Sequence, residues 1–251
     1  MKEYLYGINP AFEVVRAGKR RIYCVYIADT IRNAVRTLKL LELLKKAGVK
    51  AEFASKGRLF ELCRTTEHQG VVVEAEAYPY VSFAELLEYD RILLLDNIED
   101  PQNVGAILRS AESFGWGNVL LSSRGTAGVY PSVVKASAGA SEHLRIARDH
   151  AANYYAREAV KNGFTVVALD GSGKMTISAL EIPQEERVML VIGGEHRGVG
   201  QLILNTARYV VRIPLRGKIS SLNASVAAGV ALYLIRNRFS ADADTQPPAS
   251  V

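Results

Sequence analysis

Hydrophobic and polar positions follow two alternating periods along the first eighty residues. Apolar residues recur at helical spacing in three stretches, and each of these is followed by a short run rich in β-branched and aromatic residues. The predicted helices cover 9–18, 33–48 and 56–66, and the predicted strands cover 21–28, 49–54 and 70–78. Asn9 and Pro10 mark the start of the first helix and Gly18 marks its end. We expect a compact α/β unit.

The apolar runs become longer and nearly continuous from residue 91 onward, which is typical of strands buried on both faces. The predicted strands are 91–98, 117–123, 142–148, 164–170, 187–194 and 209–215. Helices are predicted from Asn103 onward and at 131–139, 151–163, 200–207 and 222–238. Strands and helices that alternate at these lengths predict a parallel sheet covered by helices on both faces.

These patterns divide the chain into two α/β domains. We expect a first domain at 1–78, a linker at 79–90, a second domain at 91–239 and a disordered tail at 240–251, where no apolar face exists. No apolar run reaches the roughly 18 residues of a membrane helix. The start of the chain lacks the pattern of a signal peptide, and Cys24 and Cys63 lack metal-like spacing. We expect reduced cysteines and a cytoplasmic protein.

Positive charge is concentrated in the first domain. Residues 1–80 contain 14 Lys and Arg against 9 Asp and Glu, whereas the rest of the chain contains 17 of each. A basic module beside a neutral body is typical of binding to a polyanion such as nucleic acid. A solvated domain without such a partner is an equally good interpretation of the charge alone.

Polar residues gather where three predicted strands end. Ligands of open parallel sheets bind beyond the carboxyl ends of the strands. The loops that follow the strands at 91–98, 187–194 and 209–215 present Asn103, Glu195, Ser221 and Asn223, and the first helix of the second domain adds Arg109. Simpler readings remain open, since Asn103 and Ser221 are also good helix N-caps and Glu195 is free to pair with an arginine. No dinucleotide, phosphate-loop or metal-binding motif is present.

Three segments of the second domain resemble the motifs of the SpoU/TrmH branch of the SPOUT methyltransferases. These segments are NVGAILRSA at 103–111, VIGGEHRGVG at 191–200 and IPLRGKISSLNASVAAG at 213–229. The first domain resembles the L30e-like RNA-binding extension of the family, through YGINPAFEVVRAG and HQGVVVEAEAY. The resemblance implies a parallel α/β domain with a C-terminal trefoil knot, and a homodimer.

The resemblance also implies a reaction and a site. Methyl transfer from S-adenosylmethionine to a ribose 2′-oxygen of RNA is expected, most similar to methylation of a guanosine in 23S ribosomal RNA. The cofactor would lie against Gly193, Ile213 and Leu222. Arg109 would bind a phosphate and stabilise the developing alkoxide, because a guanidinium is a cation and a poor base. Asn103 would orient Arg109 or the ribose. The implied catalytic residues are Arg109, Asn103, Glu195, Ser221 and Asn223.

The RNA contacts are expected in the basic first domain. The densest basic cluster consists of Arg16, Lys19, Arg20 and Arg21, and an exposed turn without RNA is an equally good interpretation. His68 is either a turn residue or an RNA contact. Three other functions stay open: methylation of transfer RNA, methylation that protects a producer's own ribosome, and a non-catalytic role in RNA binding or ribosome assembly. No metal and no membrane are expected among the partners.

Overall fold

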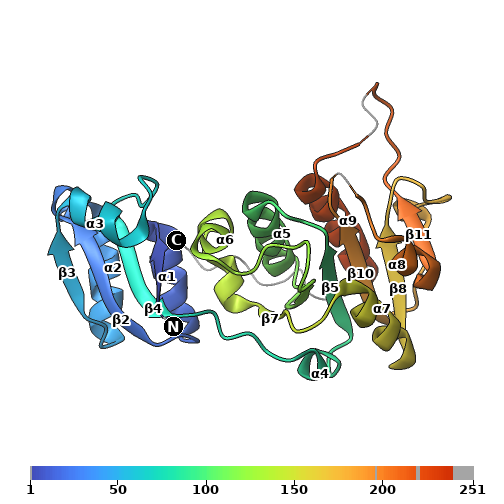
Figure 1. Ribbon diagram of the computed structural model, residues 1–251, viewed down its shortest axis with the longest axis horizontal. Helices are drawn as coiled ribbons and strands as arrows, with labels where there is room; N and C mark the ends of the chain where they lie inside the picture. Colours follow the sequence, from blue (N-terminus) through green and yellow to red (C-terminus); the bar gives the residue numbers. More distant parts are fainter. Residues whose placement is uncertain (1, 196, 219–220, 240–251) are drawn as a thin grey trace.

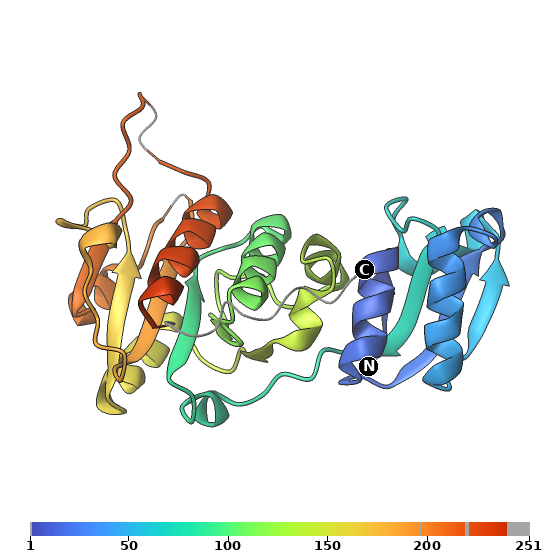
Figure 2. The ribbon, with the colours of Figure 1, turned by 180° about the vertical axis from the view of Figure 1, so that it is seen from behind.

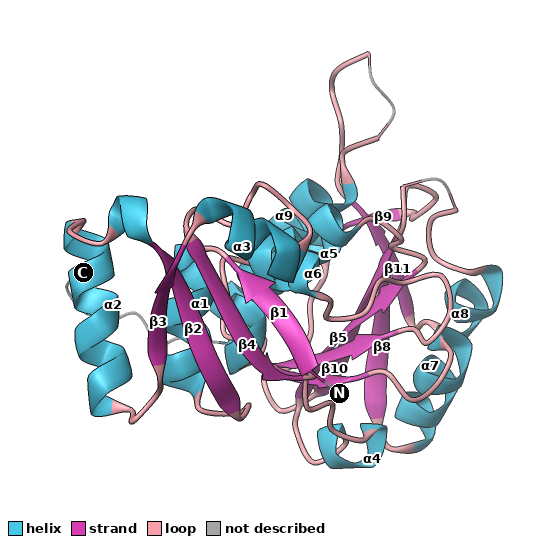
Figure 3. Ribbon diagram, turned by 60° about the vertical axis from the view of Figure 1, so that its left-hand side comes forward, coloured by secondary structure: helices cyan, strands magenta, loops and turns pink. Residues whose placement is uncertain are grey.

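The computed structural model describes residues 2–195, 197–218 and 221–239, and its strands form two separate sheets (Figure 1). The first sheet has the strand order β1-β4-β2-β3, which Figure 3 shows side by side. β4 runs antiparallel to β1 and β2, whereas β2 and β3 are parallel, so this sheet is mixed. Its strands are β1 (Lys2–Tyr6), β2 (Ile22–Ala28), β3 (Ala51–Ala54) and β4 (Val71–Glu76).

Helices cover both faces of the first sheet. α1 (Ile8–Ala17) and α2 (Val35–Lys46) lie together on one face (Figure 2), where they pack on Val25 and Val73. α3 (Lys56–Cys63) covers the other face, against Val72. The predicted α/β unit is therefore confirmed for the first domain.

The second sheet is all-parallel in the part of the chain that the structure describes, with the strand order β7-β6-β5-β10-β8-β11-β9. This confirms the predicted fold class of the second domain. Its strands are β5 (Arg91–Asp96), β6 (Asn118–Leu121), β7 (Arg145–Ala147), β8 (Phe164–Leu169), β9 (Met175–Thr176), β10 (Arg187–Gly193) and β11 (Tyr209–Arg212).

Alternate residues of the central strand β5 face two different helix layers. Leu93 and Leu95 are fully buried against the layer of α5, α6 and α9, whereas Ile92 and Leu94 are fully buried against the layer of α4, α7 and α8. Strands covered in this way read as continuous apolar runs. The bounds of these helices are α5 (Pro101–Ser113), α6 (Pro131–Ala136), α9 (Ala224–Phe239), α4 (Phe83–Leu86), α7 (Ala152–Lys161) and α8 (Gln201–Thr206).

The structure differs from the sequence prediction at short or edge elements. The sequence pattern does not predict β1, because its five residues include two charged ones at an exposed sheet edge, and β9 has only two residues. α1 begins at Ile8, so Asn9 is inside the helix and is not its N-cap. The strand predicted at 142–148 is split, since a 3₁₀ turn (Ala140–His143) precedes a shorter β7.

A buried ion pair joins the two domains. Arg20, which precedes β2, donates from Nε and Nη2 to the carboxylate of Glu142 at 2.9 and 2.7 Å, and both side chains are fully buried. Arg20 also donates to Glu3 at 2.8 Å. Tyr78, two residues after β4, stacks on the Arg20 guanidinium and donates from its hydroxyl to the carbonyl of Leu144 at 2.7 Å. These contacts hold the first domain against the 3₁₀ turn that precedes β7.

Two predictions concern parts of the chain that the structure does not fully describe. The tail at 240–251 lies outside the described residues. The implied trefoil knot depends on the segments that follow β10 and β11, and these include residues 196, 219 and 220, which also lie outside the described residues. The knot and the domain boundaries stay predictions.

Candidate functional site

Three polar side chains from distant parts of the chain meet at the carboxyl edge of the second sheet. The Nδ2 of Asn103, on α5, donates to Oε1 of Glu195 at 3.2 Å. The Nδ2 of Asn223, just before α9, donates to the same Glu195 oxygen and to Oδ1 of Asn103 at 2.9 Å. The backbone N–H of Ala224 also donates to Oε1 of Glu195, at 3.3 Å. We call Asn103, Glu195 and Asn223 the amide–carboxylate cluster.

Each member of the amide–carboxylate cluster is held by its local structure. Asp100 is the N-cap of α5 and accepts from the N–H of Gln102 at 2.9 Å, so Asn103 lies one turn inside the helix. The N-cap reading of Asn103 is therefore wrong, and its side chain is free to contact Glu195. Asn223 accepts the N–H of Ser225 at 2.9 Å through Oδ1, which satisfies a free donor at the start of α9.

The loop that carries Glu195 is shaped by backbone contacts with β5. A Cβ on Gly194 would lie 1.9 Å from the carbonyl oxygen of Asn97, so only glycine fits at this crossing. The N–H of Gly198 donates to the carbonyl of Gly194 at 2.8 Å and closes a tight turn. Asp96, at the end of β5, accepts the N–H of Gly200 at 3.0 Å, and burial raises the pKa of its carboxyl.

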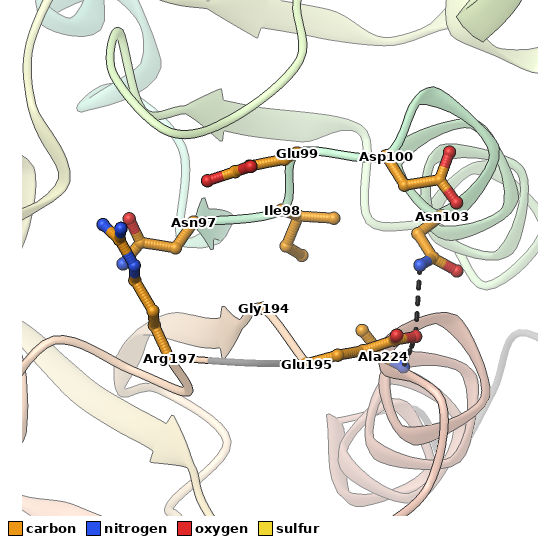
Figure 4. Close-up of a pocket in the computed structure, with 9 residues that line it drawn as sticks. All are labelled: Asn97, Ile98, Glu99, Asp100, Asn103, Gly194, Glu195, Arg197 and Ala224. Carbon is orange, nitrogen blue, oxygen red and sulfur yellow. Dashed lines mark hydrogen bonds between the residues drawn. The ribbon is translucent and has the colours of Figure 1, made fainter.

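Two cavities lie on either side of the amide–carboxylate cluster and share Gly194, Glu195 and Ala224. The first, which we call the acidic cavity, has a volume of about 340 Å³ and is shown in Figure 4. The second, which we call the aliphatic cavity, has a volume of about 200 Å³. The acidic cavity is lined by Asn97, Ile98, Glu99, Asp100, Asn103, Gly194, Glu195, Arg197 and Ala224.

The aliphatic cavity contains the residues that the sequence suggested for the cofactor. Gly193, Ile213 and Leu222 line it together with Ser221, and Asp170 and Leu215 add to the wall. Leu215 and Leu222 are 40% and 37% exposed, an unusual state for two leucines on one cavity. Aliphatic side chains beside backbone polar groups suit the base and ribose of an adenosine moiety. These residues therefore fit S-adenosylmethionine.

The structure separates Arg109 from the amide–carboxylate cluster. Six residues of α-helix place Arg109 about 9 Å beyond Asn103 along α5 and about 120° around it. Arg109 is exposed and lines a cavity of about 510 Å³ between α5 and the first domain, with Asn9, Glu13 and His143. No hydrogen bond joins Asn103 to Arg109 among the described residues, so the predicted orienting contact is absent here.

Two of the expected RNA contacts are buried in this structure. Arg20 is committed to Glu142 and Glu3, which contradicts its prediction as a phosphate contact. His68 is 7% exposed and accepts the N–H of Gly70 at its Nδ1 (2.9 Å), which favours the turn interpretation over the predicted RNA contact.

The other three basic residues are exposed. Lys19 donates from Nζ to the carbonyl of Leu144 at 2.8 Å, so its ammonium group also takes part in the contact between the two domains. Arg16 pairs with Glu13 on the same helix at 2.7 Å, and this surface pair is easily exchanged for a phosphate. The guanidinium of Arg21 lies over the ring of Tyr23. Arg16 and Arg21 therefore remain the better candidates.

Besides the helix cap Asp100, sequence reasoning missed two charged side chains in the acidic cavity, Glu99 and Arg197. Both are exposed, and neither forms a hydrogen bond or ion pair with another described residue. The sequence did contain a signal for both residues. Glu99 lies in the loop after β5 that leads to Asn103, and Arg197 lies in the loop after β10 that carries Glu195. Within the described ranges, the structure holds no group of three metal-ligating side chains, and no helix is long and apolar enough to cross a membrane.

Comparisons with known proteins cover both domains. Residues 90–233 match the SpoU rRNA Methylase family, and residues 4–81 match the RNA 2′-O ribose methyltransferase substrate-binding family. A protein of Bacillus subtilis assigned to the TrmH family of tRNA/rRNA methyltransferases is 32% identical over 239 residues, which are 92% of this chain and 94% of that protein.

Solved structures share the arrangement of both domains. The AdoMet-bound rRNA methyltransferase from Sinorhizobium meliloti superposes with a TM-score of 0.79 at 21% identity, over 96% of this chain and 88% of that chain. The SpoU methyltransferase AviRb from Streptomyces viridochromogenes, in complex with AdoMet, superposes with a TM-score of 0.77 at 23% identity, over 94% and 90% of the two chains.

Proposed function

The chain belongs to the SpoU rRNA methylase family and is an S-adenosylmethionine-dependent RNA 2′-O-ribose methyltransferase, and we propose that its target is a guanosine of 23S ribosomal RNA. The match to the SpoU rRNA Methylase family supports a ribosomal RNA target, and the observation that best supports the reaction is the pair of cavities that meet at Glu195. One cavity suits the cofactor, and the other is open for an acceptor nucleotide.

We assign the aliphatic cavity to S-adenosylmethionine, with Gly193, Ile213 and Leu222 as its contacts and Ser221 beside them. The cofactor, when bound, supplies an electrophilic methyl group on a sulfonium. The protein holds the acceptor ribose in the orientation that the reaction needs. Such positioning lowers the activation barrier by about 7–11 kcal/mol in well-oriented systems.

The amide–carboxylate cluster positions that ribose in our proposal. Oε1 of Glu195 accepts from Asn103, Asn223 and the backbone of Ala224, so the orientation of the carboxylate is fixed from three directions. Oε2 of Glu195 has no hydrogen bond with a described residue, and we assign it to a ribose hydroxyl. Asn103 and Asn223 are then positioning residues for Glu195.

Arg109 binds the RNA phosphate that adjoins the target ribose in this scheme. A guanidinium offers only hydrogen-bond donors and a positive charge, so Arg109 stabilises negative charge and does not act as a base. Its place one and a half turns along α5 suits a backbone that runs from Glu195 toward the first domain. Arg16 and Arg21 are the proposed further phosphate contacts, on the domain that matches the substrate-binding family.

We also propose a homodimer that acts in the cytoplasm. Val226 and Tyr233 are 52% and 49% exposed on α9, and the Tyr233 ring packs at a tilted angle against Phe114 at the end of α5. Exposed apolar side chains on one face of α9 favour a two-fold interface at this surface. Sedimentation of the intact protein tests this proposal, and a monomer at micromolar concentration would exclude it.

The experiment for the function is methyl transfer from labelled S-adenosylmethionine to unmodified 23S ribosomal RNA, with transfer RNA in parallel, followed by nuclease mapping. We expect one 2′-O-methylguanosine in ribosomal RNA. Label in transfer RNA would replace the substrate and keep the reaction. Absence of label together with absence of cofactor binding would favour the non-catalytic RNA-binding role.

A further inference from the structure

The acidic cavity is placed to receive the base of the nucleotide whose ribose lies at Glu195. It shares Glu195, Gly194 and Ala224 with the aliphatic cavity, so the two spaces meet at the carboxylate to which we assign the ribose. Its volume of about 340 Å³ lies in the range of small-ligand pockets. A nucleotide with its ribose at the shared wall therefore has its base in the acidic cavity, an arrangement that rests on the proposed function.

The floor of the acidic cavity suits the face of a planar ring. Ile98 is 2% exposed and contributes an apolar side chain. Gly194 contributes backbone alone, because a Cβ at this position would meet the carbonyl oxygen of Asn97. Apolar side chains against the ring faces, with polar groups at the ring edges, are one way in which proteins hold a single unstacked base.

Two charged groups of opposite sign lie at the edge of the acidic cavity. Figure 4 shows Glu99 and Arg197 extending toward the same end of the cavity, away from the contact between Asn103 and Glu195. Glu99 offers two acceptor oxygens and Arg197 offers a fork of donors. Neither is bound to another described residue, so both are available to a ligand. Asp100, by contrast, caps α5.

These two groups match guanine better than any other base. Guanine presents two acceptors, O6 and N7, on one edge, and arginine binds this pair in a bidentate manner. The neighbouring edge of guanine presents two donors, N1–H and the N2 amino group, which match a carboxylate. Adenine would instead place its N6 amino donor against Arg197, and a pyrimidine has no N7.

We propose that Glu99 and Arg197 select guanine at the target position, with Glu99 accepting from N1–H and the N2 amino group and Arg197 donating to O6 and N7. This assigns a base-specificity site to the acidic cavity. The same two residues would take no part in the methyl transfer itself.

Base analogues test this proposal with the intact protein. The substrate is a 23S ribosomal RNA fragment that carries guanosine, inosine or 7-deazaguanosine at the mapped target. Inosine lacks the N2 amino group and 7-deazaguanosine lacks N7. We expect each analogue to lower kcat/KM of the unchanged enzyme by about 5- to 150-fold, the discrimination typical of a specific base contact.

Two variants assign each loss to one residue. Glu99→Gln should treat guanosine and inosine nearly alike, and Arg197→Gln should treat guanosine and 7-deazaguanosine nearly alike. Glu185→Gln and Arg157→Gln are matched controls, because both residues are exposed and lie outside the cavities of the site. The controls should keep the full discrimination of the unchanged enzyme.

The outcomes separate the inference from the function beneath it. Equal kcat/KM for all three bases, or unchanged discrimination in both cavity variants, would overturn the base-specificity site and leave the methyltransferase intact. Methylation of a nucleotide other than guanosine would do the same. Failure of the unchanged enzyme to methylate any RNA would remove the proposed function and this inference together.

Discussion

Arg20 of the first domain and Glu142 of the second form a fully buried ion pair, with two N–H···O bonds of 2.9 and 2.7 Å. The pair joins residues 122 positions apart and lies under the ring of Tyr78. Arg20 also has Glu3 as a partner in its own domain, whereas the Glu142 carboxylate accepts only from Arg20 among the described residues and so needs the contact between the domains. The buried pair therefore fixes the position of the RNA-binding domain relative to the methyltransferase domain.

Arg20→Met should lower the free energy of unfolding by about 3–5 kcal/mol, because Glu142 then remains buried without its partner. The double variant Arg20→Met/Glu142→Leu should recover most of that loss, since the remaining unpaired carboxylate, Glu3, is partly exposed to water. Urea unfolding followed by the fluorescence of Trp116, the sole tryptophan and 1% exposed, measures both. A loss for Arg20→Met no larger than that for the exposed control Arg21→Met would contradict the structural role of the pair.

Arg16→Glu and Arg21→Glu should weaken RNA binding without changing the stability of the protein, because both side chains are exposed. Each substitution should also lower the slope of log Kd against log salt by about one, as expected when one phosphate contact is lost. Fluorescence anisotropy with a labelled ribosomal RNA fragment provides both values. Unchanged affinity and slope in the two variants would place the RNA elsewhere on the domain.

Arg109→Ala should abolish turnover, with a loss of about a hundredfold or more, because the developing negative charge loses its stabilising group. Cofactor affinity should stay within about twofold of the unchanged protein, since Arg109 does not line the aliphatic cavity. Calorimetry with S-adenosylmethionine and single-turnover methyl transfer test the two parts. Arg157→Ala serves as the control, and a folded Arg109 variant that no longer binds the cofactor would refute this role.

Asp96→Asn should change the pH dependence of stability. Burial raises the pKa of Asp96 in the folded protein above its ordinary value of about 4. The folded state then binds the Asp96 proton more tightly than the unfolded state does. The contribution of this proton to stability is complete below about pH 4 and is lost as the pH rises through the pKa of the folded state. Asparagine keeps an acceptor for Gly200 and does not titrate.

The free energy of unfolding of the Asp96→Asn variant relative to the unchanged protein should therefore rise from about pH 4 upward and then level off. Urea unfolding at several pH values between about 4 and 7.5 measures this difference. A difference that is constant over the whole range would show that Asp96 does not titrate differently in the two states.

The fold was predictable where one local pattern decides the structure. The apolar run at β5 predicted a strand covered on both faces, and the parallel sheet follows from its alternation with helices. The edge strand β1 lacks this signal, because its position is decided by pairing with β4 some seventy residues away.

The sequence predicted where the site lies in the fold, but it predicted fewer of the contacts between the side chains of the site. Loops that follow parallel strands converge at one edge, and this brings Asn103, Glu195 and Asn223 together. The N-cap of α5 was misassigned although Pro101 pointed to Asp100 as the cap. For Arg20, local sequence shows only a basic cluster, and the distant Glu142 alone decides that it is buried.

Asn103 and Asn223 are far apart in the sequence, and this separation sets the order in which the two domains become functional during synthesis. The first domain can close once β4 is available to pair with β1. Asn223 follows Asn103 by 120 residues, which take about 6 to 24 s to add at ordinary rates of translation. Until then the growing chain holds a complete RNA-binding domain and no assembled methyl-transfer site.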